Sequence, residues 1–340
     1  MVSKKRLFFI FILLILVSTV VFNWGLLYYG YGQLKGQLYV IKNSEEIEDV
    51  LNQEDFPDSL KAKLKLVQEV KQFAETELGL KKTSNYETVF NQKGEPILWV
   101  VTAAEKYRLK EYTWEFPLLG EVGYKGFFEF EKAEAERDRL KAQGLDTDIR
   151  EVMAWSTLGW FKDPVLTNFL NKEDYKLVNL IIHELTHSSL YLPDSVTFNE
   201  NFANFVAHEG TVQFLEKYNP ELLPEYLSYH HDDSLYSSIV LETASQLAVY
   251  YSSFQTESLD RKEKGKAEII LKGISLLKKG DFINKKKYSF DQLIKELPNN
   301  AYYLSFIRYE SKQDYFFNVY KENCSDLKKF MEYLIEVNSK

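Results

Sequence analysis

The sequence predicts an α+β fold that is mainly helical, with a small β-sheet preceding the helix that carries the principal motif. The segments typical of strands all lie between residues 96 and 156, and helical spacing dominates from Lys172 almost to the C-terminus. At 340 residues, with 45% hydrophobic and 27% charged residues, the chain can also bury a substantial core.

The N-terminus predicts a membrane anchor. Three basic residues at positions 4–6 precede an apolar run from Leu7 to Leu27, in which Asn23 is the only strongly polar residue. About 20 apolar residues cross a bilayer as a helix, and the basic flank favours the cytoplasmic side. We therefore predict an anchor over residues 1–30, with a single domain over residues 31–340 on the non-cytoplasmic side of a bacterial cell envelope. A cleaved signal segment is the alternative, because small residues follow the apolar run.

The elements after the anchor follow from local spacing. Residues 36–80 are predicted to contain a long amphipathic helix that ends near Gly79, from the spacing of Leu60, Leu64, Val67, Val70 and Phe73. Strands are predicted over residues 96–103, within 111–129 and over 149–156, with a charged helix over 132–143 and a loop over 157–164. Helices are then predicted over residues 172–191, 198–218, 237–254 and 314–337, and residues 260–272 are predicted to form a solvated helix face.

Composition excludes some classes of function. The chain has 42 Lys and Arg against 50 Asp and Glu, a net charge of -8, so nucleic acid is not an expected partner. Its single cysteine, Cys324, cannot form an internal disulfide or a thiolate metal cluster. A bound metal must therefore be held by His, Asp or Glu.

An HExxH motif lies in the segment from Val178 to Leu190, which reads VNLIIHELTHSSL. Residues four apart share one face of a helix, so His183 and His187 can bind one zinc ion. Glu184, beside the first histidine, is placed to take a proton from a water at the metal and is the predicted catalytic base.

Catalytic zinc usually has three protein ligands, so a third must be found. Twelve residues separate His187 from Glu200, and Pro193 and Asp194 supply a turn that returns a second helix alongside the first. Glu200 in the first turn of that helix is the predicted third ligand. Asn204, one turn further on, could donate a hydrogen bond to one of the metal-ligating side chains. His208, a further turn along, is a weaker candidate for the same role.

Several supporting roles remain open at this stage. A developing oxyanion needs a donor, and a substrate with a free ammonium group would need a carboxylate to pair with it. The candidates for the donor are Tyr250, Tyr251, Tyr302 and Tyr303, together with His230 and His231 in a predicted polar loop; those for the carboxylate are Glu209 and Glu242. Residues 120–128 could offer a strand edge to a peptide, or could simply be a turn-rich sheet.

These residues give the chain a resemblance to the bacterial predicted-aminopeptidase family, zinc proteins of the HExxH-plus-Glu, gluzincin-like type. The matching segments are GQLYVI, FAETELGL, FPLLGEVGYKGFF, AWSTLGWFKDPVL, IIHELTHSSLY, NENFANFVAHEG and NNAYYLSFIRY. The resemblance implies a zincin-like fold, one Zn²⁺ held by the two motif histidines and Glu200, and removal of N-terminal residues from peptides. Two departures are the absence of a cysteine near the N-terminus, where family members often carry a lipoprotein signal, and His208, where another polar residue is usual.

We therefore predict a zinc-dependent peptide hydrolase, most specifically an aminopeptidase, with a peptide substrate and a membrane attachment through its N-terminal helix. The alternatives are a zinc endopeptidase of the cell envelope and a membrane-tethered binding protein that keeps a zinc-supported fold without turnover. Glu184 argues against the second alternative, because a structural site has no need of this carboxylate. Another divalent metal could occupy the same ligands. The sequence does not indicate an oligomeric state.

Overall fold

The computed structural model describes residues 23–116, 120–152, 162–254, 256–322 and 326–338. Most of the predicted anchor, residues 1–22, lies outside these ranges, as do most of the predicted loop over 157–164 and the end of the strand expected over 149–156. None of the helices in the described ranges combines the length and the hydrophobicity that a membrane crossing requires. The anchor therefore stays a prediction.

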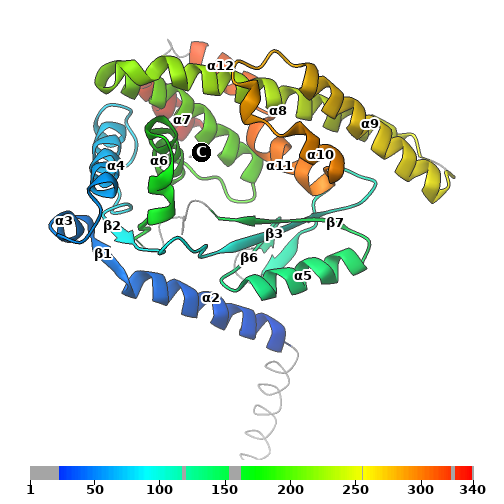
Figure 1. Ribbon diagram of the computed structural model, residues 1–340, viewed down its shortest axis with the longest axis horizontal. Coiled ribbons are helices and arrows are strands. Elements are labelled where there is room, and N and C mark those ends of the chain that lie inside the picture. Colours follow the sequence, from blue (N-terminus) through cyan, green and yellow to red (C-terminus); the bar gives the residue numbers. More distant parts are fainter. Residues whose placement is uncertain (1–22, 117–119, 153–161, 255, 323–325, 339–340) are drawn as a thin grey trace, which may run out of the picture.

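The described chain is mainly helical with small sheets, as the sequence predicts (Figure 1). The α-helices are α2 (Trp24–Lys42), α3 (Ile47–Leu51), α4 (Asp58–Thr76), α5 (Phe130–Ala142), α6 (Asp174–Ser189), α7 (Val196–Tyr218), α8 (Leu223–Ser252), α9 (Leu259–Lys279), α10 (Phe290–Lys295), α11 (Asn300–Glu310), α12 (Gln313–Glu322) and α13 (Leu327–Asn338). The strands are β1 (Ser44–Glu46), β2 (Thr88–Phe90), β3 (Trp99–Ala104), β4 (Trp114–Phe116), β5 (Gly120–Val122), β6 (Lys125–Phe127), β7 (Asp146–Glu151) and β8 (Val165–Leu166).

The described strands form three small sheets, where the sequence predicts only one. Their orders are β1-β2-β8, β6-β3-β7 and β4-β5. The first sheet includes a parallel pair between β2 and β8 that local spacing does not reveal, because its two short strands lie far apart in the chain. The strands expected between residues 96 and 129 are confirmed as β3 to β6.

The two faces of strand β3 have different surroundings. Its side chains alternate, as they must in a strand. Val101 and Ala103 are buried in a cluster with Ala133 and Leu140 of α5, and α5 and α11 lie on opposite faces of the sheet in Figure 1. Val100 and Thr102 point the other way and line a cleft together with residues of α6 and α11. One face of this sheet is therefore core, and the other is available for chemistry.

The largest core surrounds α4, α6 and α7. Leu64, Val67, Val70 and Phe73 are all buried on α4, as the predicted spacing requires. The prediction is wrong, however, where it treats residues 36–80 as one helical range, because the end of α2, β1, α3 and α4 share this range and Pro57 directly precedes α4. The helix ends at Thr76, and Gly79 follows with φ +76°, a conformation that glycine adopts without strain. The apolar side of α6, the helix that carries the HExxH motif, packs into this core.

Four other sequence predictions need correction. His230 and His231 lie within α8 rather than in a loop, because Pro224 starts this helix and no Gly or Pro interrupts it before Ser252. The helix predicted over 314–337 is two helices, and Asp326 accepts a hydrogen bond from Lys329 N at the start of the second.

The other two concern β7 and α9. The strand expected over 149–156 already begins at Asp146, since β7 pairs with β3 along its whole length. The helix face expected to be solvated contains a buried residue, Lys266, which pairs with Asp146.

Candidate metal centre and catalytic cleft

Helices α6 and α7 run antiparallel and bring the motif against Glu200. Asn179 near the start of α6 donates to Thr211 near the end of α7, while His183 and His187 lie beside Glu200 at the start of α7. Gly210 permits this close approach, because a Cβ atom there would lie 2.7 Å from Leu78 Cδ1 and 3.2 Å from two atoms of Ile182. The two helices can thus place three polar side chains around one point.

The three predicted ligands form a nearly equilateral triangle. His183 Nε2 lies 3.2 Å from His187 Nε2 and 3.3 Å from Glu200 Oε2, and His187 Nε2 lies 3.5 Å from the same oxygen. Among the described residues, this is the one group of three or more His, Cys, Asp or Glu side chains arranged closely enough to hold a metal ion.

The triangle fits zinc. Ligand atoms held at 2.0–2.1 Å from a tetrahedral zinc ion lie about 3.3 Å from one another. Two imidazole nitrogens and one carboxylate oxygen are also a ligand set that catalytic zinc uses. The donor set and its spacing therefore match the ion that the sequence predicts.

Burial and their mutual contacts shift the pKa values of His183, Glu184 and Glu200. Burial would raise the pKa of Glu200, but hydrogen bonds from His183 and His187 hold it well below its usual range. Burial lowers the pKa of His183, but the hydrogen bond to Glu200 and the negative charges of Glu184 and Glu200 together outweigh this effect, so the pKa is raised. Burial raises the pKa of Glu184, against the opposing charges of the two histidines. A carboxyl group with a raised pKa is suited to accept and return a proton.

Asn199 fixes the turn that leads into α7. Its Oδ1 accepts from Leu192 N and its Nδ2 donates to Leu192 O, both at 2.8 Å, and the residue is fully buried. Because Asn199 directly precedes Glu200, this pair of hydrogen bonds fixes the start of the helix that presents the third ligand. Asn199 was not among the predicted site residues.

Two further asparagines of α7 tie the end of α11 to the metal centre. Asn201 Nδ2 donates to Arg308 O at 2.7 Å, and Asn204 Nδ2 donates to Tyr309 O at 3.0 Å and to Glu310 Oε1 at 2.8 Å. A hydrogen bond with Asn204 also contributes to the raised pKa of His183. Asn204 therefore forms a hydrogen bond with the predicted ligand His183, which is the role that its spacing predicts.

A cleft of about 440 Å³ opens beside the triangle, between α6, α11 and the β3–β7 face. Its lining includes His183 and Glu184 from α6, Arg308 and Tyr309 from α11, and the end of β7. The Tyr309 ring lies 6.5 Å from the His183 ring, nearly parallel to it, and the Arg308 guanidinium forms an ion pair with Glu111. Arg308 and Tyr309 were not among the predicted candidates, although Tyr302 and Tyr303 of the same segment were.

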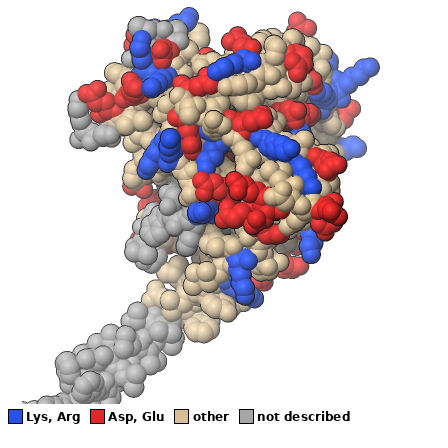
Figure 2. Space-filling view, turned by 90° about the vertical axis from the view of Figure 1, so that its left-hand side faces the viewer, with Lys and Arg blue, Asp and Glu red and all other residues tan. Residues whose placement is uncertain are grey.

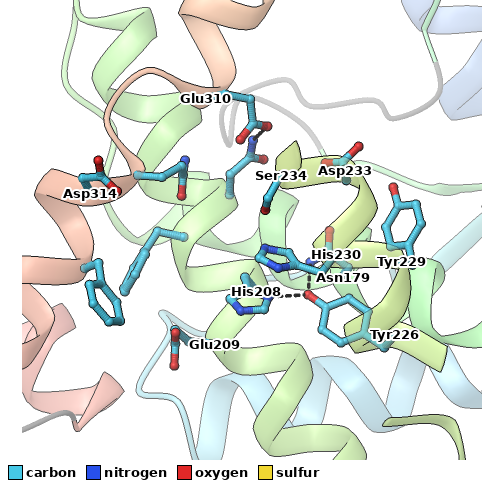
Figure 3. Close-up of a pocket in the computed structure, with 14 residues that line it drawn as sticks. Asn179, His208, Glu209, Tyr226, Tyr229, His230, Asp233, Ser234, Glu310 and Asp314 are labelled. Carbon is cyan, nitrogen blue, oxygen red and sulfur yellow. Dashed lines mark hydrogen bonds between the residues drawn. The ribbon is translucent and has the colours of Figure 1, made fainter. Parts of the chain in front are cut away.

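A second pocket of about 440 Å³ adjoins this cleft and shares Asn179, Asn204 and Tyr229 as lining residues (Figure 3). Glu310 of α11 and Asp233 of α8 both line it. Burial, together with the negative charge of Asp233, raises the pKa of Glu310 to about 8.

His208 and His230 stack in the same pocket with ring centroids 3.5 Å apart, and His208 Nδ1 lies 2.9 Å from the Tyr226 hydroxyl (Figure 3). Burial lowers the pKa of His208 to about 3 and that of His230 to about 4. Both rings are therefore neutral near pH 7, and neither belongs to the ligand triangle.

The remaining candidates lie elsewhere in the described structure. Three of the candidate tyrosines use their hydroxyl groups in other hydrogen bonds: Tyr250 with Arg261 O, Tyr251 with Asn300 Oδ1 and Tyr302 with the Tyr236 hydroxyl. Tyr303 is buried in a separate core. Glu242 binds Gln246 on an exposed face of α8, whereas Glu209 does line the second pocket. In the segment 120–128, β6 is an edge strand, but Gly126 O already accepts from Gln33 of α2.

The whole described domain also matches a known family. The model of the family described as "Putative aminopeptidase" matches residues 28–340, which includes every residue of the triangle and both pockets. No curated protein and no solved structure matches the chain. Since the family model spans far more than half of the sequence, the chain belongs to the family described as "Putative aminopeptidase".

Proposed function

We propose that the protein is a zinc-dependent aminopeptidase in which Glu184 acts as the general base. The observation that carries this proposal is the triangle formed by His183, His187 and Glu200, with Glu184 in the cleft beside it. Membership of an aminopeptidase family supports peptide hydrolysis as the activity.

His183, His187 and Glu200 would hold the ion. Zinc in such a site supplies a Lewis acid that polarises a carbonyl group and makes water more acidic. Glu184 takes the proton of the attacking water at its carboxylate and returns it to the leaving amine. The raised pKa of this buried carboxyl group supports both steps, because a base must also be able to act as an acid.

Arg308 and Tyr309 are the groups that we assign to the substrate carbonyl. Both line the cleft that contains Glu184, and both offer hydrogen-bond donors. Donors fixed before reaction stabilise the negative charge that develops on the carbonyl oxygen. The hydrogen bonds from Asn201 and Asn204 to the backbone of these two residues hold them in place.

Glu310 and Asp233 support cleavage from the amino terminus. An aminopeptidase must pair the ammonium group of its substrate with a carboxylate, and these two line the pocket adjoining the cleft. A bound ammonium group would stabilise the ionised form of Glu310, which burial disfavours. We therefore place the free amino end of the substrate in the second pocket.

The test compares the wild type with Glu184→Gln, measuring zinc content and the hydrolysis of unblocked and N-acetylated peptides. We expect one zinc in both proteins and a loss of kcat of about 10²-fold or more in Glu184→Gln. Glu216→Gln, an exposed position on α7, is the matched control and should retain activity.

The outcomes separate the alternatives. Cleavage of unblocked but not of blocked peptides supports an aminopeptidase, and equal cleavage of both would select an endopeptidase. Zinc without cleavage of either would leave a tethered binding protein, and a wild-type protein that binds no metal would overturn the proposal.

A further inference from the structure

Helix α2 leaves one side covered with large apolar residues exposed. The side facing the rest of the protein carries Gln33, Gly36 and Gln37, with Val40 as its fully buried apolar residue. The opposite side carries large apolar residues that are 38–64% exposed, namely Trp24, Leu27, Tyr28, Tyr31, Leu34, Leu38, Tyr39 and Ile41. Surface helices normally bury such a face against the core.

The orientation of α2 is fixed by specific contacts. Gln33 Nε2 donates to Gly126 O at 3.0 Å, and a Cβ atom on Gly36 would lie only 2.3 Å from the Phe128 ring. The Tyr29 ring packs 5.7 Å from the rings of both Phe116 and Phe127. Rotation of the helix to bury its apolar side would break all of these contacts, so the exposed side belongs to the folded state.

The charge of the chain is also divided at this helix. Residues 1–42 contain five Lys or Arg and no Asp or Glu, so the net charge of -8 divides into +5 for this segment and -13 for the rest. Lys35 and Lys42 are exposed on the apolar side of α2. The lower end of the described surface in Figure 2, where the grey atoms join it, is mostly uncharged, whereas the body above it carries many acidic side chains.

We propose that the exposed side of α2 lies flat on the surface of an anionic lipid bilayer. Trp and Tyr prefer the interface between water and acyl chains, and Lys pairs with anionic headgroups. The eight residues of this side include four Trp or Tyr, and Lys35 and Lys42 lie on the same side. The strongly apolar residues 7–17 precede the same helix, which adds a second segment with affinity for lipid.

A second copy of the chain is the competing occupant, and the composition of α2 favours lipid. Residues 24, 27, 31, 34, 38 and 41 follow the spacing of a helix-to-helix seam, but two of them are Trp24 and Tyr31, whereas such seams favour Leu, Ile and Val. Two copies would also bring two segments of charge +5 together, which opposes pairing.

The test uses the full chain with Cys324→Ser and a single new cysteine that carries an environment-sensitive fluorophore. Leu34→Cys and Leu38→Cys report on α2, and Val249→Cys and Leu259→Cys are controls at apolar positions that are 68% exposed on α8 and α9. Vesicles contain equal parts of phosphatidylglycerol and phosphatidylethanolamine, with and without bromine on the acyl chains. We expect a blue shift and quenching by brominated lipid at positions 34 and 38, and neither effect at 249 or 259.

Two results would overturn the proposal. One is a chain that sediments with the vesicles while the labels at 34 and 38 stay in water, since residues 1–22 alone would then make the attachment. The other is a blue shift at these positions without vesicles that grows with protein concentration, which would identify a second copy as the occupant. In Lys35→Glu/Lys42→Glu, quenching at position 38 should weaken, and unchanged quenching would contradict the charge argument. These readouts need no peptidase activity, so they are independent of the proposed function.

Discussion

Asn199 and Leu192 are joined by two hydrogen bonds of 2.8 Å, one in each direction between the Asn199 amide group and the Leu192 backbone. The pair closes the turn between the helix with the histidines and the helix with Glu200. A side chain with one donor and one acceptor is required, which few residue types provide.

Asn199→Ala should therefore weaken both the turn and the metal site. It leaves the partly buried N–H and C=O of Leu192 without partners, so we expect a loss of about 2 kcal/mol in the free energy of unfolding. Zinc affinity should fall about 10-fold to 100-fold, because support for a ligand is lost. Chelator competition and urea unfolding measure the two effects. Asn52→Ala, which removes an exposed hydrogen bond to Glu48, is the control; full zinc affinity in Asn199→Ala would show that the turn does not position Glu200.

Glu310→Gln should impair recognition of the substrate amino terminus while sparing the metal. Glutamine can still accept the hydrogen bond from Asn204, but it cannot pair with an ammonium group. We expect kcat/KM for unblocked peptides to fall about 10-fold to 100-fold, the usual cost of losing a buried charge partner, with unchanged zinc content. Glu322→Gln, on the exposed end of α12, is the control. Unaltered kinetics in Glu310→Gln would place the amino terminus elsewhere.

Lys266→Met should destabilise the contact between α9 and the sheet. Lys266 Nζ lies 2.5 Å from Asp146 Oδ2, and both side chains are at least 90% buried. Removal of one partner from a buried ion pair costs about 3–5 kcal/mol, since the other charge remains buried. The exposed pair of Lys278 and Asp291 provides a contrast, and Lys278→Met should change the stability by less than about 1 kcal/mol. Thermal unfolding of both variants checks this; equal effects would mean that Asp146 finds a substitute partner.

His230 should make stability depend on pH. Its pKa is about 4 in the folded protein and about 6.5 when unfolded, so only the unfolded state gains a proton between these values. The contribution of this residue is therefore complete above pH 6.5 and is lost as the pH falls toward 4. His230→Phe keeps an aromatic ring against His208 but cannot be protonated. From pH 7 to pH 4 the wild type should lose about 2 kcal/mol more stability than this variant, after allowance for partial exposure. Parallel pH profiles of the two proteins would contradict a neutral buried His230.

The grouping of His183, His187 and Glu200 could be predicted because the sequence signal for it is local. Two histidines one helical turn apart and a carboxylate after a short turn are fixed by helix geometry alone. Arg308, Tyr309 and Glu310 carry no such signal. They reach the cleft because Asn201 and Asn204 bind the end of α11 across more than 100 residues, and that docking is a tertiary event. The sheet formed by β1, β2 and β8 was missed for the same reason, since β2 and β8 are brought together by the fold.

The exposed apolar side of α2 could not be predicted for a different reason. The pattern of Trp, Tyr and Leu along residues 24–41 is visible in the sequence, but its direction is not. Periodicity tells which residues share a face, and only the contacts of Gln33, Gly36 and Tyr29 tell which face is outward. The helix at positions 230 and 231 was missed because polar residues were read as a loop signal.

Because side chains alternate along β3, the register of this strand decides which of them line the cleft. Val101 and Ala103 belong to the apolar layer with α5, and their neighbours Val100 and Thr102 form a wall of the cleft. Insertion of a single residue before Val100 would exchange the two sets. The Thr102 hydroxyl would then be forced into the apolar layer, and Val101 and Ala103 would line the cleft in place of Val100 and Thr102. This short strand therefore tolerates substitution far better than any change of length.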